Sequence, residues 1–118
     1  MAAARKRRHG SNLSGERMGK TIKVRSELRG DVAIIRMLLR HPMKVGRVLK
    51  SGERIKPHFI SELECRHNGT IVMTGHFGAG VSANPYVEFR ITGAARGDNV
   101  AIRWVDNQGG QDAVETTL

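Results

Sequence analysis

The chain has 118 residues, one cysteine, five histidines, 4% aromatic residues and a formal net charge of +9. This length allows one domain, and a single cysteine excludes an internal disulfide. No apolar run is long enough to span a bilayer, so the composition predicts one domain with a core of mainly aliphatic side chains.

The positive charge is unevenly distributed. Residues 1–20 contain six basic residues against one acidic residue, a net charge of +5, which leaves +4 of the total for residues 21–118. Residues 1–18 are small, polar and basic, so we expect a disordered leader that is a start-site extension or an appended sequence. The functional alternative is a tail that binds nucleic acid or an acidic surface. The leader lacks the apolar segment of a signal peptide, which predicts no export signal of its own.

The next segments alternate or are apolar throughout. Residues 21–28 alternate between apolar and charged side chains, which predicts a strand. Residues 32–39 are apolar on both faces apart from one arginine. Their β-branched residues favour a central strand that ends at His41-Pro42, because proline lacks a backbone donor. Residues 43–56 contain five basic residues and turn-forming glycines, which predicts a long, mobile, basic loop or a loose hairpin.

A hairpin organises the predicted fold. Phe59, Leu63 and Cys65 recur at even spacing and charged residues fill alternate positions, which is typical of a half-buried strand. Asn68-Gly69 follows, the pair best suited to a type I′ turn, and residues 70–74 return as a second strand. Antiparallel hairpins of this kind belong to sandwiches and barrels.

The expected register of this hairpin has a further consequence. A two-residue turn pairs Cys65 with Val72, and Glu64 with Met73. It places Cys65 and Val72 on a core face, and Ile71 and Met73 on the opposite face beside charged residues. That apolar strip is either ordinary scattered surface apolarity or a docking face for another chain.

The remaining strands follow from alternation and turn signals. A glycine-rich connection at residues 75–85 precedes a strand at 86–92 and another whose inward face is formed by Val100, Ile102 and Trp104. Residues 113–118 form a last edge strand or a frayed end. The chain is therefore predicted to be all-β, with about seven short strands in an immunoglobulin-like antiparallel β-sandwich.

Few groups are available for metal or phosphate chemistry. The possible metal ligands are Cys65 and the histidines His9, His41, His58, His67 and His76. Cys65 and His67 lie two apart on one strand face, which in principle allows chelation. However, the chain has no CxxC pair, no HExxH motif and no zinc-finger spacing, so we predict no metal site. The glycine-rich segment at 75–80 matches no phosphate-binding loop, and we predict no cofactor.

Cys65 is also the only candidate thiol nucleophile. With a nearby histidine it suggests a thiol enzyme, but its strand position places it among apolar residues. Burial there raises the pKa of a thiol and makes it inert. We therefore predict a structural cysteine and no catalytic residue.

Several short motifs occur in a recognisable order and resemble the SoxZ family over about residues 19–110. They are HisProMet at 41–43, ProHisPheIle at 57–60, HisAsnGly at 67–69, ValSerAlaAsnProTyr at 81–86, Phe89, GlyAsp at 97–98 and TrpValAspAsnGlnGly at 104–109. Each motif is short, and their common order and spacing carry the similarity. The resemblance implies an immunoglobulin-like domain over residues 19–118.

The resemblance also implies a non-catalytic role. Members of the family pair with SoxY, which bears sulfur intermediates of thiosulfate oxidation on a cysteine at the end of a glycine-rich C-terminal arm. This chain ends in AlaValGluThrThrLeu without such an arm, so it resembles the scaffold partner of that carrier. Through SoxY it is expected to meet SoxAX, SoxB and SoxCD, away from the membrane. The implied location is the periplasm, reached by export with a signal-bearing partner.

The candidate interface residues come from two sources. Ile71 and Met73 form the apolar strip of the hairpin, whereas His41, Pro42, Met43, Asn84, Pro85 and Tyr86 shape loops that contact sulfur enzymes or fix turns. The alternative function is a basic nucleic-acid-binding module that acts through the leader and residues 44–56. The scarcity of aromatic residues for base stacking argues against nucleic acid.

Overall fold

The structure, a computed structural model, describes residues 12–118, and these residues form ten β-strands and no helix. The strands are β2 (Asn12–Met18), β3 (Ile22–Arg29), β4 (Val32–Leu39), β5 (Arg47–Val48), β6 (Arg54–Ile55), β7 (Ile60–His67), β8 (Thr70–His76), β9 (Tyr86–Thr92), β10 (Asn99–Asp106) and β11 (Gln111–Thr117). Accordingly, no helix in this part of the chain is long and apolar enough to cross a membrane.

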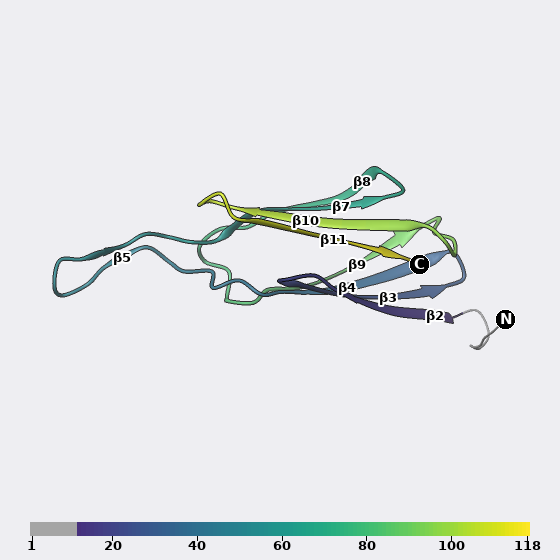
Figure 1. The fold of residues 1–118 in the computed structure, drawn as a ribbon, viewed down its shortest axis with the longest axis horizontal. Helices are drawn as coiled ribbons and strands as arrows, with labels where there is room; N and C mark the ends of the chain where they lie inside the picture. Colours follow the sequence, from purple (N-terminus) through teal and green to yellow (C-terminus); the bar gives the residue numbers. More distant parts are fainter. Residues whose placement is uncertain (1–11) are drawn as a thin grey trace.

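Eight of these strands form two facing antiparallel sheets (Figure 1). One sheet has the order β11-β10-β7-β8, and the other has the order β2-β3-β4-β9. This arrangement confirms the predicted all-β, immunoglobulin-like sandwich. The strand not foreseen is β2, whereas β5 and β6 correspond to the loose hairpin that was one of two alternatives for residues 43–56.

The core lies between the sheets and follows the alternation read in the sequence. In β3, Ile22 and Val24 are buried between exposed or half-buried charged neighbours. In β10, Val100, Ile102 and Trp104 point inward as predicted. Burial of these aliphatic side chains supplies most of the free energy that favours folding, because each fully buried one contributes about 1.5–3 kcal/mol.

The expectation of a disordered leader is wrong for residues 12–18. They form β2, which pairs with β3 from Asn12 opposite Arg29 to Met18 opposite Lys23. Backbone pairing at a sheet edge does not require the apolar alternation that residues 12–18 lack. Glu16 adds ion pairs with Lys23 and Arg25 of β3. Residues 1–11 lie outside the described residues, and their disorder stays a prediction.

The predicted hairpin is confirmed, but its register differs from the expected one after the first two residue pairs, His67–Thr70 and Arg66–Ile71. Asn68 and Gly69 have φ of 49° and 85°, as a type I′ turn requires. A β-bulge then inserts one extra residue on β8, so that Cys65 lies opposite Met73. Val72, expected in the core, is therefore 42% exposed, and Met73, expected on the outer face, packs against the core. Only Ile71 keeps its predicted exposed position.

Residues 43–56 form the loose hairpin that was one of the two alternatives. Arg47 pairs with Ile55, and Val48 pairs with Arg54. We call residues 44–56 the arm. It extends beyond one end of the sandwich, opposite the end where the C-terminus lies (Figure 1).

The two long sides of the sandwich differ. On one side β11 contacts β2 and β3. There Thr21 donates its backbone N–H (2.9 Å) and its hydroxyl (2.5 Å) to Asp112 Oδ2, and accepts a hydrogen bond from Trp104 Nε1 at 3.1 Å. Among the described residues no comparable set of contacts joins the opposite edge strands, β8 and β9. The sandwich is closed along β11 and open along β8 and β9.

We expect Leu63→Ala to lower the free energy of unfolding by about 2–5 kcal/mol, because Leu63 is fully buried in the core and its removal leaves a cavity. Ile71→Ala on the neighbouring strand is the control, since Ile71 is 49% exposed, and it should cost less than about 1 kcal/mol. Urea denaturation measures both values, and equal costs would contradict the described core.

Candidate functional site

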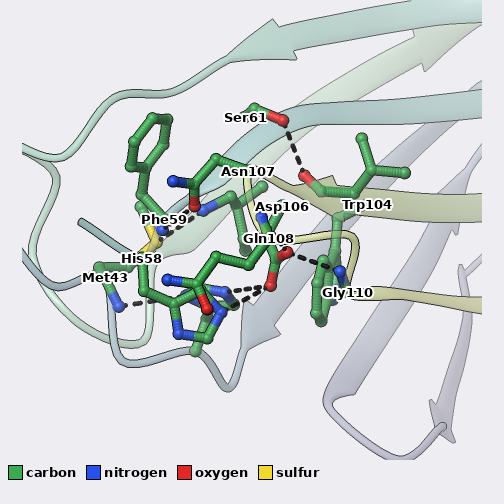
Figure 2. A network of polar contacts seen from close by, with 12 residues as sticks. Met43, His58, Phe59, Ser61, Trp104, Asp106, Asn107, Gln108 and Gly110 are labelled. Atoms are coloured by element: carbon green, nitrogen blue, oxygen red, sulfur yellow. Dashed lines mark hydrogen bonds and ion pairs between the residues drawn. The ribbon is translucent and has the colours of Figure 1, made fainter. Parts of the chain in front are cut away.

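The end of the sandwich from which the arm extends gathers His41, His58 and Asp106. His41 follows β4, His58 precedes β7, and Asp106 is the last residue of β10. Asp106 Oδ2 lies 3.0 Å from His41 Nε2 and 2.8 Å from His58 Nε2. Residues that are 65 and 48 positions apart in the sequence thus share one carboxylate oxygen. Figure 2 shows this network with its neighbours.

The second carboxylate oxygen of Asp106 is held by the turn that follows β10. Its Oδ1 accepts hydrogen bonds from the backbone N–H of Gln108 at 2.9 Å and of Gly110 at 2.7 Å. A Cβ at position 110 would come within 2.5 Å of Asp106 Oδ2, so the turn requires glycine there. With two donors on each oxygen, this buried carboxylate is well satisfied.

These contacts set the charge of Asp106. Burial opposes ionisation, but hydrogen bonds from His41, His58 and the two backbone N–H groups outweigh it and lower the pKa of the carboxyl to about 2. At neutral pH Asp106 is therefore an anion that only accepts hydrogen bonds. Both histidines consequently carry a proton on Nε2 and donate it to Asp106.

The cluster also has the composition of a metal site, since its three ligand atoms lie within 4.8 Å of one another. The surroundings of His41 disfavour that interpretation. The backbone N–H of Met43 donates to His41 Nδ1 at 3.1 Å, whereas a histidine that binds a metal through Nε2 donates its other N–H to an acceptor. The geometry favours a hydrogen-bonded group, which we call the histidine clamp.

The histidine clamp fixes the base of the arm. His58 exchanges two backbone hydrogen bonds with Lys44, at 2.6 and 2.9 Å, and so joins the two ends of the arm. Asn107 Nδ2 and Gln108 Nε2 donate to Pro57 O at 2.9 and 3.0 Å, which ties the β10–β11 turn to the returning chain. The clamp and the turn together set the direction in which the arm leaves the body.

Several of the predicted loop residues build the neighbouring turns, which was one of the two roles expected for them. His41 N donates to Asn84 Oδ1 at 3.0 Å, and Asn84 N donates to His41 O at 2.9 Å. Met43 and Asn84 have φ of 49° and 54°, a left-handed conformation found in turns. Of the six loop residues, His41, Met43 and Pro85 are buried and Pro42, Asn84 and Tyr86 are exposed. The structure thus brings segments 41–43 and 84–86 together mainly as mutual supports.

Tyr86 belongs to a second exposed apolar group that the sequence did not reveal. Cross-strand pairing aligns Met18, Lys23, Leu38 and Tyr86 in one row across the sheet of β2, β3, β4 and β9. The three apolar members are 60%, 43% and 60% exposed. Residues 32–39 are apolar on both faces, so alternation could not assign Leu38 outward, and Met18 fell in the presumed leader.

Cys65 and His67 do not form the metal-binding or nucleophilic pair that the sequence allowed. His67 Nε2 lies 2.7 Å from Asp98 Oδ2, at the end of the sandwich away from the arm. Cys65 is fully buried, and burial raises the pKa of its thiol to about 12. Such a thiol stays protonated at neutral pH and is a poor nucleophile.

The fold and the site define an immunoglobulin-like β-sandwich domain with a projecting basic arm. The family model described as sulphur oxidation protein SoxZ matches residues 22–117. Because this match covers most of the chain, the chain belongs to the SoxZ family and is a subunit of the Sox sulfur-oxidation system. A search of curated proteins found no match. The family match confirms the similarity inferred from the short motifs.

We expect Asp106→Asn to lower the free energy of unfolding at pH 7 by about 2–4 kcal/mol, because an amide cannot replace an anion that accepts four hydrogen bonds. The folded pKa lies below the ordinary value of 3.8, so the charge stabilises the fold above about pH 4. About 2 kcal/mol of that stabilisation is lost as the pH falls from about 4 to 2.

The wild-type protein should show this loss, and the difference between its pH profile and that of Asp106→Asn isolates Asp106 from the other carboxyls. Asp31→Asn, in an exposed turn, is the matched control and should leave the profile unchanged. Chemical denaturation at several pH values measures the profiles. Parallel wild-type and Asp106→Asn profiles would contradict the described clamp.

Cys65 should not react with a water-soluble disulfide reagent in the native protein, because its thiol is buried and protonated. We expect labelling only at the rate of unfolding, and complete labelling in denaturant. Absorbance of the released thiolate follows both reactions. Rapid labelling under native conditions would show that Cys65 is accessible and reopen a chemical role for it.

Proposed function

We propose that this chain is a non-catalytic scaffold subunit that pairs with SoxY, the subunit that carries covalently bound sulfur intermediates in thiosulfate oxidation. The family match supports a place in the Sox system. Within the proposal, SoxY presents its sulfur adduct to SoxAX, SoxB and SoxCD while this chain supports SoxY. The proposed location is the periplasm, reached together with a signal-bearing SoxY.

The open side of the sandwich is the observation that supports a permanent partner. Ile71 and Val72 of β8 are 49% and 42% exposed, and β8 is a sheet edge with unpaired backbone groups. Inside the opening, Met73, Phe77, Val87 and Phe89 pack against the core and are only half-buried. A standard interface buries about 800 Å² on each partner, and covering these side chains would supply apolar area for it.

The state of Cys65 agrees with a supporting role. A carrier thiol must reach the pockets of several enzymes and must ionise to form a sulfur adduct. Cys65 is fully buried in the middle of β7, and the pKa of its thiol is raised. In this proposal the carrier cysteine therefore belongs to SoxY.

Nucleic-acid binding is the second candidate function, because the arm is strongly basic. Single-stranded nucleic acid is usually held by stacking of its bases on exposed aromatic rings. Among the described residues, Tyr86 is the single large aromatic side chain that is exposed. The structure therefore favours a protein partner over a nucleic acid.

Co-expression with SoxY should give a stable one-to-one complex by gel filtration with light scattering at micromolar concentration. Ile71→Glu and Val72→Glu should each weaken the complex by about tenfold or more, because a buried unpaired carboxylate opposes association. Ala113→Glu, on the exposed face of the opposite edge strand β11, is the matched control and should have little effect. Separate elution of the wild-type chain and SoxY would contradict the proposal.

A further inference from the structure

The whole net charge of residues 21–118 lies in the arm. Residues 21–118 have fourteen basic and ten acidic residues, a net charge of +4. The arm has five basic residues and one acidic residue, which is also +4, so the rest of this range has nine of each and is neutral. The arm's basic residues are Lys44, Arg47, Lys50, Arg54 and Lys56.

The charges of the arm have no partner within the part of the chain that the structure describes. Each of the ten ion pairs found there uses a lysine, arginine or histidine of the body. In the body, by contrast, Arg36 is paired with both Glu27 and Glu88. The arm therefore presents unpaired positive charge, whereas the rest of residues 21–118 has equal numbers of basic and acidic residues.

The arm also lacks packing. Its two strands pair only with each other, and no sizeable set of contacts joins β5 or β6 to another strand among the described residues. Val45 and Val48 are 60% and 61% exposed, and a shallow hollow of about 360 Å³ is lined by Lys44, Val45, Arg47 and Ile55. An isolated two-stranded hairpin is at best marginally stable in water. The base of the arm is held by hydrogen bonds, whereas the rest of the arm packs against nothing in the described chain. This combination is typical of an element that packs against another molecule.

We propose that the arm docks on an acidic surface of the subunit with which this chain forms its heterodimer, with Val45 and Val48 against apolar side chains there. The inference rests on the proposed function, and it adds a second contact that is electrostatic and distinct from the apolar open side. A permanent partner fits better than a transient one, because a hairpin without packing of its own needs continuous cover to stay folded. Positive charge and exposed valines together match an acidic protein surface with an apolar floor.

The test uses the full chain and SoxY, with binding measured by calorimetry at several salt concentrations. We expect Arg47→Glu and Arg54→Glu each to weaken the heterodimer by about tenfold at low salt, with a smaller loss at high salt where charges are screened. Arg96→Glu, an identical charge change in the exposed β9–β10 turn at the far end of the sandwich, is the control. It should change the affinity by less than about twofold. Thermal unfolding should be the same for all three variants, because none of these arginines packs in the core.

Hydrogen exchange gives a readout of the arm itself, since backbone amides of residues 47–55 should exchange more slowly in the heterodimer than in the free chain. Arm variants that bind SoxY like the wild type would overturn the inference and leave the proposed function intact, as would an equal loss with Arg96→Glu. If the wild-type chain does not bind SoxY, the proposed function fails and this inference fails with it. Binding of a 20-base-pair DNA duplex that depends on Arg47 and Arg54, with unchanged SoxY affinity, would assign the arm to nucleic acid.

Discussion

One buried carboxylate holds together the end of the molecule from which the arm projects. Asp106 takes hydrogen bonds from His41 before the arm, from His58 after it and from the β10–β11 turn. A buried charge is stabilising only when all its acceptor positions are used, and removing one donor leaves part of its desolvation uncompensated. The three segments are therefore interdependent, because all of them donate hydrogen bonds to the same carboxylate group.

The two long sides of the sandwich differ in how far the sheets contact each other. Along β11 the sheets contact each other, and the Trp104–Thr21–Asp112 hydrogen bonds connect them across the edge. Along β8 and β9 the inner apolar side chains are half-buried and two exposed residues stand on the rim. Open edge strands with apolar side chains are usually protected in monomeric proteins, because they invite pairing with other chains. This exposed edge is the observation on which the proposed pairing with SoxY rests.

The sequence predicted the layers of this fold better than its details. Alternation located β3, β7, β9 and β10, because inward and outward positions of a half-buried strand differ in polarity. The bulge at Val72 was not predictable in this way, since one inserted residue changes the register without changing composition. β2 was missed because an edge strand can be held by backbone pairing and ion pairs alone.

The histidine clamp was predictable only in part. His41 and His58 were considered as metal ligands beside Cys65, but nothing local connects either of them with Asp106. Their meeting depends on the end of β4, the start of β7 and the end of β10 lying at the same end of the sandwich, which is a property of the topology. The loop residues at 84–86 were found by family similarity, and their role as turn supports became visible only through their contacts with His41 and Leu39.

The anchored base of the arm has a mechanical consequence. With about six residues on each side and about 3.3 Å per residue, the hairpin reaches about 20 Å from its base. A tilt of about 10° there would swing its tip through about 3.5 Å, which is more than the length of a hydrogen bond. A small rotation at the base of the arm, around Asp106, therefore produces a larger displacement at its tip. A rigid base is what keeps the position of the tip defined relative to the sandwich.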